Sequence, residues 1–275
     1  MRDLLSMTHA PHGTDTHQGV SLVLGGGAVR GYYHLGVLRA LRERGVAIRE
    51  IIGTSVGALV GAILAARPDA DIAALMGEVS VARLVELTPI RPSVLGTRKI
   101  ERALRALIPI ERFEDLQIPL TVIATDINTG EEVVFRSGPL FPALLASMAI
   151  PGVFPLVEHG GRVLADGGVV DNLPVRHATG RVVVASDVTF ALQVITPRSG
   201  KVPVVLNALY TMMRELNRLQ VDAARAQGKN VILLELNKPI FAGDVRRSQL
   251  DALIAQGYED ARAALRGYSG MTPWK

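Results

Sequence analysis

The residues with the clearest chemical meaning are Gly53-Thr54-Ser55-Val56-Gly57, which match the pattern G-x-S-x-G. An apolar run precedes them and a helix-like run follows, and this is the context in which the pattern holds a nucleophilic serine. The two glycines permit a turn too tight for larger side chains. Ser55 also stands at the predicted helix N-terminus, where free N–H groups favour a developing negative charge. A serine N-cap with close helix packing explains the same residues, so the motif needs a second feature.

A glycine-rich loop supplies that second feature. The segment Gly25–Gly31, with the sequence GGGAVRG, follows the apolar run Val20–Leu24. The loops after neighbouring parallel strands meet at one edge of a sheet, and paired strands lie only ~4.8 Å apart. Loop amides beside Ser55 would then be able to donate to the oxyanion of a tetrahedral intermediate. A dinucleotide-binding loop fits poorly, because G-x-G-x-x-G counted from Gly25 requires a glycine where Arg30 stands.

A serine hydroxyl also needs a base, because it is a weak nucleophile by itself. Asp166 is the favoured candidate, since it ends a short predicted strand and is followed by Gly167 and Gly168, which allow close approach of the backbone. Other aspartates end strands or turns, and a few histidines lie outside the N-terminal segment, none within a recognisable motif: Asp126, Asp171, Asp187, His34, His159 and His177.

The elements that position these residues alternate between strand and helix along the chain. Such alternation predicts parallel strands joined by right-handed crossovers. The predicted strands are Val20–Leu24, Val46–Ile52, Pro119–Asp126, Glu132–Phe135, Arg162–Ala165, Arg181–Ala185 and Val231–Leu236, and the clearest helices are Tyr32–Arg44, Val56–Ala66, Leu140–Met148, Val205–Gln227 and Ser248–Arg266.

The predicted fold class is α/β, with a mainly parallel sheet and helices on both of its faces. No repeat or linker divides the chain, so we expect a disordered lead-in over residues 1–18, a single domain over residues 19–268 and a tail over residues 269–275. A chain of 275 residues that is 48% hydrophobic can bury a large core without a metal or disulfide staple. The absence of cysteine excludes thiolate nucleophiles and cysteine-ligated zinc.

Charge and hydropathy limit the partners. Thirty Lys and Arg against 26 Asp and Glu give a net charge of +4 without any basic block, so nucleic acid is not an expected partner. The uncharged stretch Ser137–Val157 contains Pro139, Pro142, Pro151 and Pro155 and does not fit a membrane-spanning helix. The N-terminal segment lacks the apolar region of a signal peptide. We therefore expect a cytoplasmic protein with a weak peripheral attraction to anionic membranes.

Four blocks of the sequence, in this order, resemble the patatin-like phospholipase family. They are Gly25–Gly31, Gly53–Gly57, Ala146–Pro151 with the sequence ASMAIP, and Asp166–Pro174 with the sequence DGGVVDNLP. Among relatives the chain looks most like the compact bacterial type. The resemblance implies a three-layer α/β/α fold and a serine–aspartate dyad without histidine, cofactor or metal. In that dyad Ser55 is the nucleophile and Asp166 is the base.

The resemblance also implies which residues surround the dyad. The oxyanion hole would comprise Gly26, Gly27, Ala28 and Arg30, and the motif glycines would be Gly25, Gly31, Gly53, Gly57, Gly167 and Gly168. The sequence departs from the family pattern at Ala28, where the third loop glycine is expected. Alanine keeps the N–H group but tolerates fewer backbone conformations.

The predicted function is a serine acyl hydrolase that cleaves lipid acyl esters through an acyl-enzyme intermediate, of phospholipase A, lysophospholipase or carboxylesterase type. One alternative is a Ser-Asp-His α/β-hydrolase that uses His177, although that fold places several strands before its serine. Another is a regulatory or scaffolding protein that kept the fold and lost turnover. The sequence leaves open the acyl chain length, the head group, the positional preference, the oligomeric state and the physiological partner.

Overall fold

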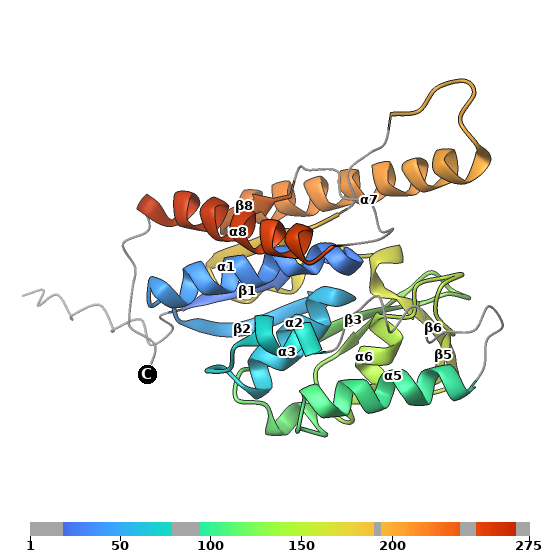
Figure 1. Ribbon diagram of the computed structural model, residues 1–275, viewed down its shortest axis with the longest axis horizontal. Helices are drawn as coiled ribbons and strands as arrows, with labels where there is room; N and C mark the ends of the chain where they lie inside the picture. Colours follow the sequence, from blue (N-terminus) through green and yellow to red (C-terminus); the bar gives the residue numbers. More distant parts are fainter. Residues whose placement is uncertain (1–18, 79–93, 190–193, 237–245, 268–275) are drawn as a thin grey trace, which may run out of the picture.

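The computed structural model describes residues 19–78, 94–189, 194–236 and 246–267 (Figure 1). Within these ranges the strands form one eight-stranded sheet in the order β5-β6-β3-β2-β1-β7-β8, with β4 also paired to β3. The neighbours β3, β2, β1, β7 and β8 are parallel, whereas the pairs made by β4, β5 and β6 are antiparallel. The strands are β1 Val20–Leu24, β2 Ile48–Thr54, β3 Leu120–Asp126, β4 Glu132–Phe135, β5 Val157–His159, β6 Arg162–Asp166, β7 Val182–Asp187 and β8 Asn230–Glu235.

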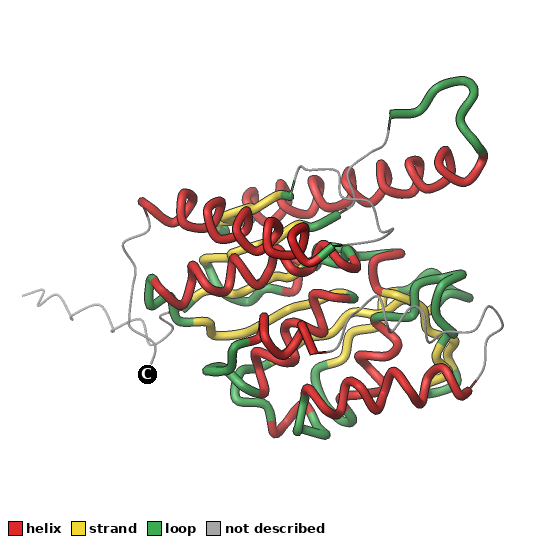
Figure 2. Tube along the Cα trace, in the orientation of Figure 1, coloured by secondary structure: helices red, strands yellow, loops and turns green. Residues whose placement is uncertain are grey.

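Helices cover both faces of the sheet (Figure 2). Along β1, Leu22 and Leu24 join a large core with most of the helices, whereas Val23 points to the opposite core, which α7 covers. This alternation confirms the predicted α/β fold with a mainly parallel, two-sided sheet. The helices are α1 Tyr32–Glu43, α2 Val56–Ala66, α3 Ile72–Glu78, α5 Val94–Leu107, α6 Leu140–Ser147, α7 Lys201–Ala226 and α8 Arg247–Ala264, with short 3₁₀ turns at η1 Ala28–Gly31, η2 Phe113–Asp115, η3 Gly167–Val169, η4 Val175–His177 and η5 Leu265–Gly267.

The helix α2 lies at the centre of the larger core. Every residue of α2 is buried, as expected for a helix that is apolar on all sides. A Cβ on Gly61 would lie 2.8 Å from a methyl group of Ile51 on β2, so the small residue lets the helix approach the sheet closely. A helix held this way fixes the position of Ser55, the residue immediately before it.

The two loops that carry the sequence motifs leave the sheet side by side. The strands β1 and β2 are parallel neighbours, and Leu24 is paired with Gly53 at their carboxyl ends. The glycine loop after β1 therefore begins next to the turn that holds Ser55, as the strand order in the sequence predicts.

Some features differ from the sequence-based expectation. The three-residue strand β5 was not predicted, because its sequence Val-Glu-His is too short to show alternation. The helix α7 begins at Lys201 rather than Val205, since Pro203 falls in the first turn, where its missing N–H has no helical partner to lose. The expected lead-in over residues 1–18 and the tail over residues 269–275 lie outside the described residues. Among the helices that are described, none combines the length and apolarity needed to cross a membrane.

The contact between α1 and α8 yields a test of the fold. A Cβ on Gly257 of α8 would collide with the carbonyl oxygen of Tyr33, and one on Gly36 of α1 would collide with that of Ile254. Gly257→Ala is therefore expected to lower the free energy of unfolding by roughly 1–3 kcal/mol, although alanine is the better helix former by about 1 kcal/mol. Urea denaturation measures the change. Ala255→Leu on the exposed face of α8 is the control, with an expected change within about 0.5 kcal/mol.

Candidate active site

Ser55 occupies a strained turn between β2 and α2. Its φ of 56° and ψ of −124° lie in a region that side-chain-bearing residues rarely adopt. The neighbouring glycines make this turn possible: a Cβ on Gly57 would collide with the carbonyl group of Leu24, and one on Gly53 would lie 2.6 Å from the amide nitrogen of Ala58. The G-x-S-x-G motif is thus a steric requirement of the turn.

The end of α6 holds the backbone of both predicted catalytic residues. The N–H of Ser55 donates to Oγ of Ser147 at 2.8 Å, and Ser147 is fully buried. The N–H of Asp166 donates to the carbonyl oxygen of Ala149 at 2.9 Å. Both Ser147 and Ala149 lie within the block Ala146–Pro151, but the sequence alone assigns Ser147 no role, because only the fold brings α6 to this turn.

The structure brings Ser55 and Asp166 into direct contact. The hydroxyl of Ser55 donates to Oδ2 of Asp166 at 2.6 Å, and the N–H of Gly168 donates to Oδ1 at 2.7 Å. Both side chains are buried, with 5% and 6% of their residues' surface exposed. The carboxylate is therefore oriented by one hydrogen bond and directed at the serine by the other.

The position of Asp166 follows from an antiparallel pairing. The strand β6 runs against β3, with Asp166 opposite Ala124, and Oγ1 of Thr125 donates to the carbonyl oxygen of Asp166 at 2.9 Å. A Cβ on Gly167 would collide with the carbonyl oxygen of Ile123. The glycine after the aspartate is thus needed for β6 to end against β3.

Burial sets the proton affinity of this carboxylate. Desolvation raises the pKa of Asp166 from 3.8 to about 6, although the hydrogen bonds from Ser55 and Gly168 lower it. At neutral pH the group is still ionised, but it accepts a proton far more readily than an exposed aspartate. A carboxylate with this pKa has the proton affinity that general-base catalysis near neutral pH requires.

Hydrogen bonds of the glycine loop limit which of its N–H groups are free to donate to an oxyanion. The N–H of Gly26 already donates to the carbonyl oxygen of Asn172 at 3.1 Å, and that of Arg30 donates to Gly27 at 3.0 Å. The N–H groups of Gly27 and Ala28 make no hydrogen bond within the described part of the chain. Because internal acceptors occupy the amides of Gly26 and Arg30, we expect Gly27 and Ala28 to be the donors, and the wider oxyanion hole of Gly26, Gly27, Ala28 and Arg30 stays a prediction.

Ala28 stands where the sequence departs from the family pattern. Its φ is 50°, in the left-handed region that glycine adopts freely and alanine only at a cost of roughly 1–2 kcal/mol. Ala28 nevertheless adopts this conformation, and its N–H makes no hydrogen bond within the described part of the chain. The loop is thus held in this form by its surroundings.

One residue that supports the loop is the buried histidine of α1. His34 is completely buried, its Nε2 lies 2.9 Å from the carbonyl oxygen of Gly25, and its Nδ1 lies 2.8 Å from Oγ of Ser186. Burial lowers the pKa of His34 to about 4, so the ring is neutral at pH 7. Nε2 then donates to Gly25, and Nδ1 accepts from Ser186. His34 supports the loop and does not face the serine hydroxyl, whose partner is Asp166.

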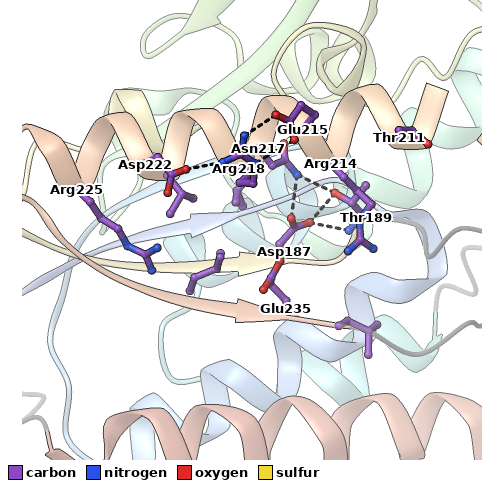
Figure 3. Close-up of a pocket in the computed structure, with 14 residues that line it drawn as sticks. Asp187, Thr189, Thr211, Arg214, Glu215, Asn217, Arg218, Asp222, Arg225 and Glu235 are labelled. Carbon is purple, nitrogen blue, oxygen red and sulfur yellow. Dashed lines mark hydrogen bonds and ion pairs between the residues drawn. The ribbon is translucent and has the colours of Figure 1, made fainter. Parts of the chain in front are cut away.

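A buried polar network that extends to α7 also supports the loop. Nδ2 of Asn172 donates to the carbonyl oxygen of Gly26 at 3.2 Å and to Oγ1 of Thr189 at 2.7 Å. Nδ2 of Asn217, on α7, donates to Oγ1 of Thr189 and to Oδ2 of Asp187, each at 2.9 Å (Figure 3). Asn172 therefore holds Gly26 through both its side chain and its backbone, and α7 is connected to the glycine loop.

This network forms one wall of a cavity of about 660 Å³ between α7 and the ends of β7 and β8 (Figure 3). Neither Ser55 nor Asp166 lines it. Arg218, on the α7 side, pairs with Glu215 at 2.6 Å and with Asp222 at 2.9 Å. The cavity is thus a charged cleft behind the glycine loop and separate from the dyad.

His177, the base of the alternative triad, is engaged elsewhere. Its Nε2 lies 2.8 Å from Glu132, and Arg176 pairs with Glu132 at 2.9 Å and with Asp171 at 3.0 Å. Ligand atoms of Glu132, Asp171 and His177 lie within 4.8 Å of one another, but the guanidinium group of Arg176 already pairs with both carboxylates. The residues fit an ion-pair cluster better than a metal centre or a catalytic triad.

The remaining candidates also have other partners. Oδ1 of Asp126 accepts from the N–H of Asn128 at 3.1 Å, which is a turn contact. Asp187 belongs to the network of Asn217 described above, and the ring of His159 packs against that of Phe135 at 5.5 Å.

The site combines a strained serine turn, a buried carboxylate in contact with the serine, and two loop amides without a hydrogen-bond partner in the described chain. This combination defines an α/β protein whose serine lies in a tight turn between a strand and a helix. The chain belongs to the patatin-like phospholipase family, whose model matches residues 22–179 and so includes both members of the dyad. An uncharacterized NTE family protein of Mycobacterium tuberculosis is 40% identical over 216 residues, which are 75% of this chain and 59% of that protein. The chain thus spans less than two thirds of that relative's length.

More distant similarities extend over less of the relatives. Lysophospholipase NTE1 of Saccharomyces cerevisiae is 35% identical over 174 residues, which are 60% of this chain and 10% of that protein. The crystal structure of the type III effector protein ExoU is similar with a TM-score of 0.51 at 17% identity, over 91% of this chain and 53% of ExoU. That likeness concerns the fold alone.

The buried carboxylate predicts a pH-dependent stability. The pKa of Asp166 is higher in the folded protein, at about 6, than its ordinary value of 3.8, so the folded state binds more protons between these values. Stability therefore falls as pH rises from about 4 to 6, and the ionised group costs on the order of 2–3 kcal/mol above that window. Asp166→Asn is expected to raise the free energy of unfolding by that order at pH 7.5 and by much less at pH 4.5.

Urea denaturation at the two pH values measures this difference. Asp69→Asn, at an exposed carboxylate, is the control and should change the free energy of unfolding by less than about 0.5 kcal/mol. If Asp166→Asn changes the free energy of unfolding by the same amount at both pH values, burial of the charged carboxylate is not what destabilises the folded protein.

Proposed function

We propose that the chain is a serine acyl hydrolase that cleaves lipid acyl esters with a dyad of Ser55 and Asp166. The observation that carries the proposal is the 2.6 Å hydrogen bond from the hydroxyl of Ser55 to Oδ2 of Asp166, on a strained turn beside the free amides of Gly27 and Ala28. We further propose that residues 19–268 act as one catalytic domain.

In the proposed reaction Asp166 takes the proton of Ser55 as Oγ attacks the ester carbonyl carbon. The negative charge that develops on the carbonyl oxygen is stabilised by the N–H groups of Gly27 and Ala28 and by the N-terminus of α2. When the tetrahedral intermediate collapses, protonated Asp166 gives its proton to the leaving alcohol. Water then attacks the acyl-enzyme, Asp166 accepts a proton from it, and the fatty acid leaves as Ser55 regains its hydrogen.

The substrate class is supported by the family and its relatives. The family name is patatin-like phospholipase, and one relative is named a lysophospholipase. We therefore propose an ester of a fatty acid with a glycerolipid or lysolipid as substrate. A regulatory protein without turnover is less well supported, because the hydrogen bond between serine and carboxylate is intact.

The first functional prediction concerns the nucleophile. Ser55→Ala is expected to abolish fluorophosphonate labelling and to lower kcat for p-nitrophenyl esters on the order of 10⁶-fold, since the covalent route disappears. His177→Ala is expected to keep most of the activity, because His177 is bound to Glu132. Active-site labelling with mass spectrometry and ester hydrolysis measure both effects. Absence of labelling in the folded wild-type chain would favour the regulatory protein, and an inactive, folded His177→Ala would favour a triad.

The second functional prediction concerns pH. Because burial raises the pKa of Asp166 to about 6, its protonation below that pH removes the base. The ratio kcat/KM is expected to fall tenfold per pH unit below about 6 and to level off above pH 7. The same acidic limb should persist in His34→Gln and His177→Ala, which separates a carboxylate base from an imidazole. A limb that vanishes with either histidine would contradict the assignment of Asp166.

A further inference from the structure

The helix α7 is much longer than the strands it connects. Its 26 residues span ~39 Å, whereas the six residues of β7 span ~20 Å. It follows β7 and returns to the start of the parallel strand β8, so its N-terminal end lies at the carboxyl edge of the sheet, the edge that carries Ser55. In Figure 1 this N-terminal half projects past the ends of α1 and α8.

Only the C-terminal half of α7 packs on the sheet. Asn217, Val221 and Ala224 are buried there, whereas none of the described side chains from Lys201 to Leu216 is buried. The N-terminal half is therefore helical without a core to bury it, although isolated helices of this length are marginal in water.

The exposed part of α7 carries an apolar stripe. Five large apolar residues recur at alternating steps of four and three, which places them on one face of the helix. Their exposed fractions are between 42% and 62%, and we call this set the α7 stripe: Val205, Leu209, Met212, Leu216 and Leu219. A soluble monomer rarely leaves so many large apolar side chains together in water, and such a face marks a site of interaction.

The other exposed apolar residues lie near the same edge. Of the large hydrophobic side chains exposed in the described chain, most fall between Val194 and Leu219, and the rest lie in the segments that follow β3, α6 and β6: Ile127, Val153, Leu156 and Val169. The methyl group of Met213 would lie 3.4 Å from a Cβ on Gly168, so α7 contacts the turn directly after Asp166. Apolar exposure is thus concentrated around the side of the molecule that holds the candidate active site.

The charged residues before and within the N-terminal part of the α7 stripe are basic, and the acidic residue within its span, Glu215, is paired with Arg218. No Asp or Glu occurs between residues 188 and 214, whereas Arg198, Lys201 and Arg214 do occur there. An apolar ridge with basic residues at its N-terminal end matches the acyl chains and anionic headgroups of a lipid surface. The stripe spans only two heptads, fewer than the three or four that predict a coiled coil with a second copy.

We propose that the α7 stripe docks on a lipid bilayer that contains anionic lipids and so brings the edge carrying Ser55 onto the membrane. The consequence for catalysis rests on the proposed function, whereas the docking itself does not. The stripe enters the acyl boundary, Arg198 and Lys201 contact headgroups, and ester substrates reach Ser55 from the bilayer.

Binding is tested with the full chain and vesicles of phosphatidylcholine, with and without phosphatidylglycerol, by co-sedimentation. The double variant Leu209→Gln, Met212→Gln is expected to weaken binding to anionic vesicles by about tenfold or more, since two apolar anchors are lost. Lys201→Gln is expected to weaken it about fivefold at low salt. Thr211→Gln is the matched control on α7 and should bind like the wild type. Thr211 precedes Met212 in the sequence, but its side chain lines the cavity rather than the stripe. Equal binding by the double variant and the wild type would overturn the proposal.

A second arm separates docking from catalysis. The Ser55→Ala variant is expected to bind vesicles like the wild type. In the active chain, the double variant should lower the ratio of vesicle-lipid hydrolysis to soluble-ester hydrolysis roughly tenfold. If no substrate is hydrolysed but binding depends on the stripe, the docking stands and the proposed function fails. If light scattering shows a dimer that the double variant dissociates, while vesicle binding is unchanged, the stripe joins two copies and the docking proposal fails.

Discussion

The backbone conformation of Ser55 is the constraint on which the rest of the site depends. A residue with a side chain held at positive φ costs on the order of 1–3 kcal/mol, so the turn persists only because its surroundings leave no alternative. The wholly buried α2 fixes one end of the turn, the glycines at positions 53 and 57 fit where no Cβ does, and Ser147 binds the N–H of Ser55. If this turn relaxed, the hydroxyl would lose its 2.6 Å contact with Asp166.

The carboxylate places an opposite demand on the fold. Burial raises the pKa of Asp166 and makes it a better base, but the same desolvation destabilises the folded protein at neutral pH. The structure offsets the cost locally: the N–H of Gly168 binds one carboxylate oxygen, and the backbone of Asp166 is bonded to Ala149 and Thr125. The short antiparallel strand β6 therefore holds the carboxylate of Asp166 in a buried position where its negative charge is unfavourable.

Much of this arrangement could be predicted from the sequence, because its signals are local. Glycines flanking Ser55 and following Asp166 report tight turns at strand ends, and the alternation of strands and helices places both turns at one edge. The donors of the glycine loop could not be assigned that way. Whether the N–H of Gly26 is free depends on the carbonyl of Asn172, 146 residues away, and nothing in the loop encodes that contact. Ser147, 92 residues from Ser55, was missed for the same reason.

In α7 the apolar spacing of the sequence does not correspond to a buried face. Its apolar spacing is visible in the sequence and is normally evidence of a buried face. Here β7 and β8 are too short to cover the helix, so the same pattern ends in solvent at the edge that holds the dyad. The buried half of α7 meanwhile contributes Asn217 to the network that reaches Gly26 through Thr189 and Asn172. The same helix therefore carries an exposed apolar face and, through this network, supports the glycine loop, so a partner bound to that face would contact an element on which the position of the loop depends.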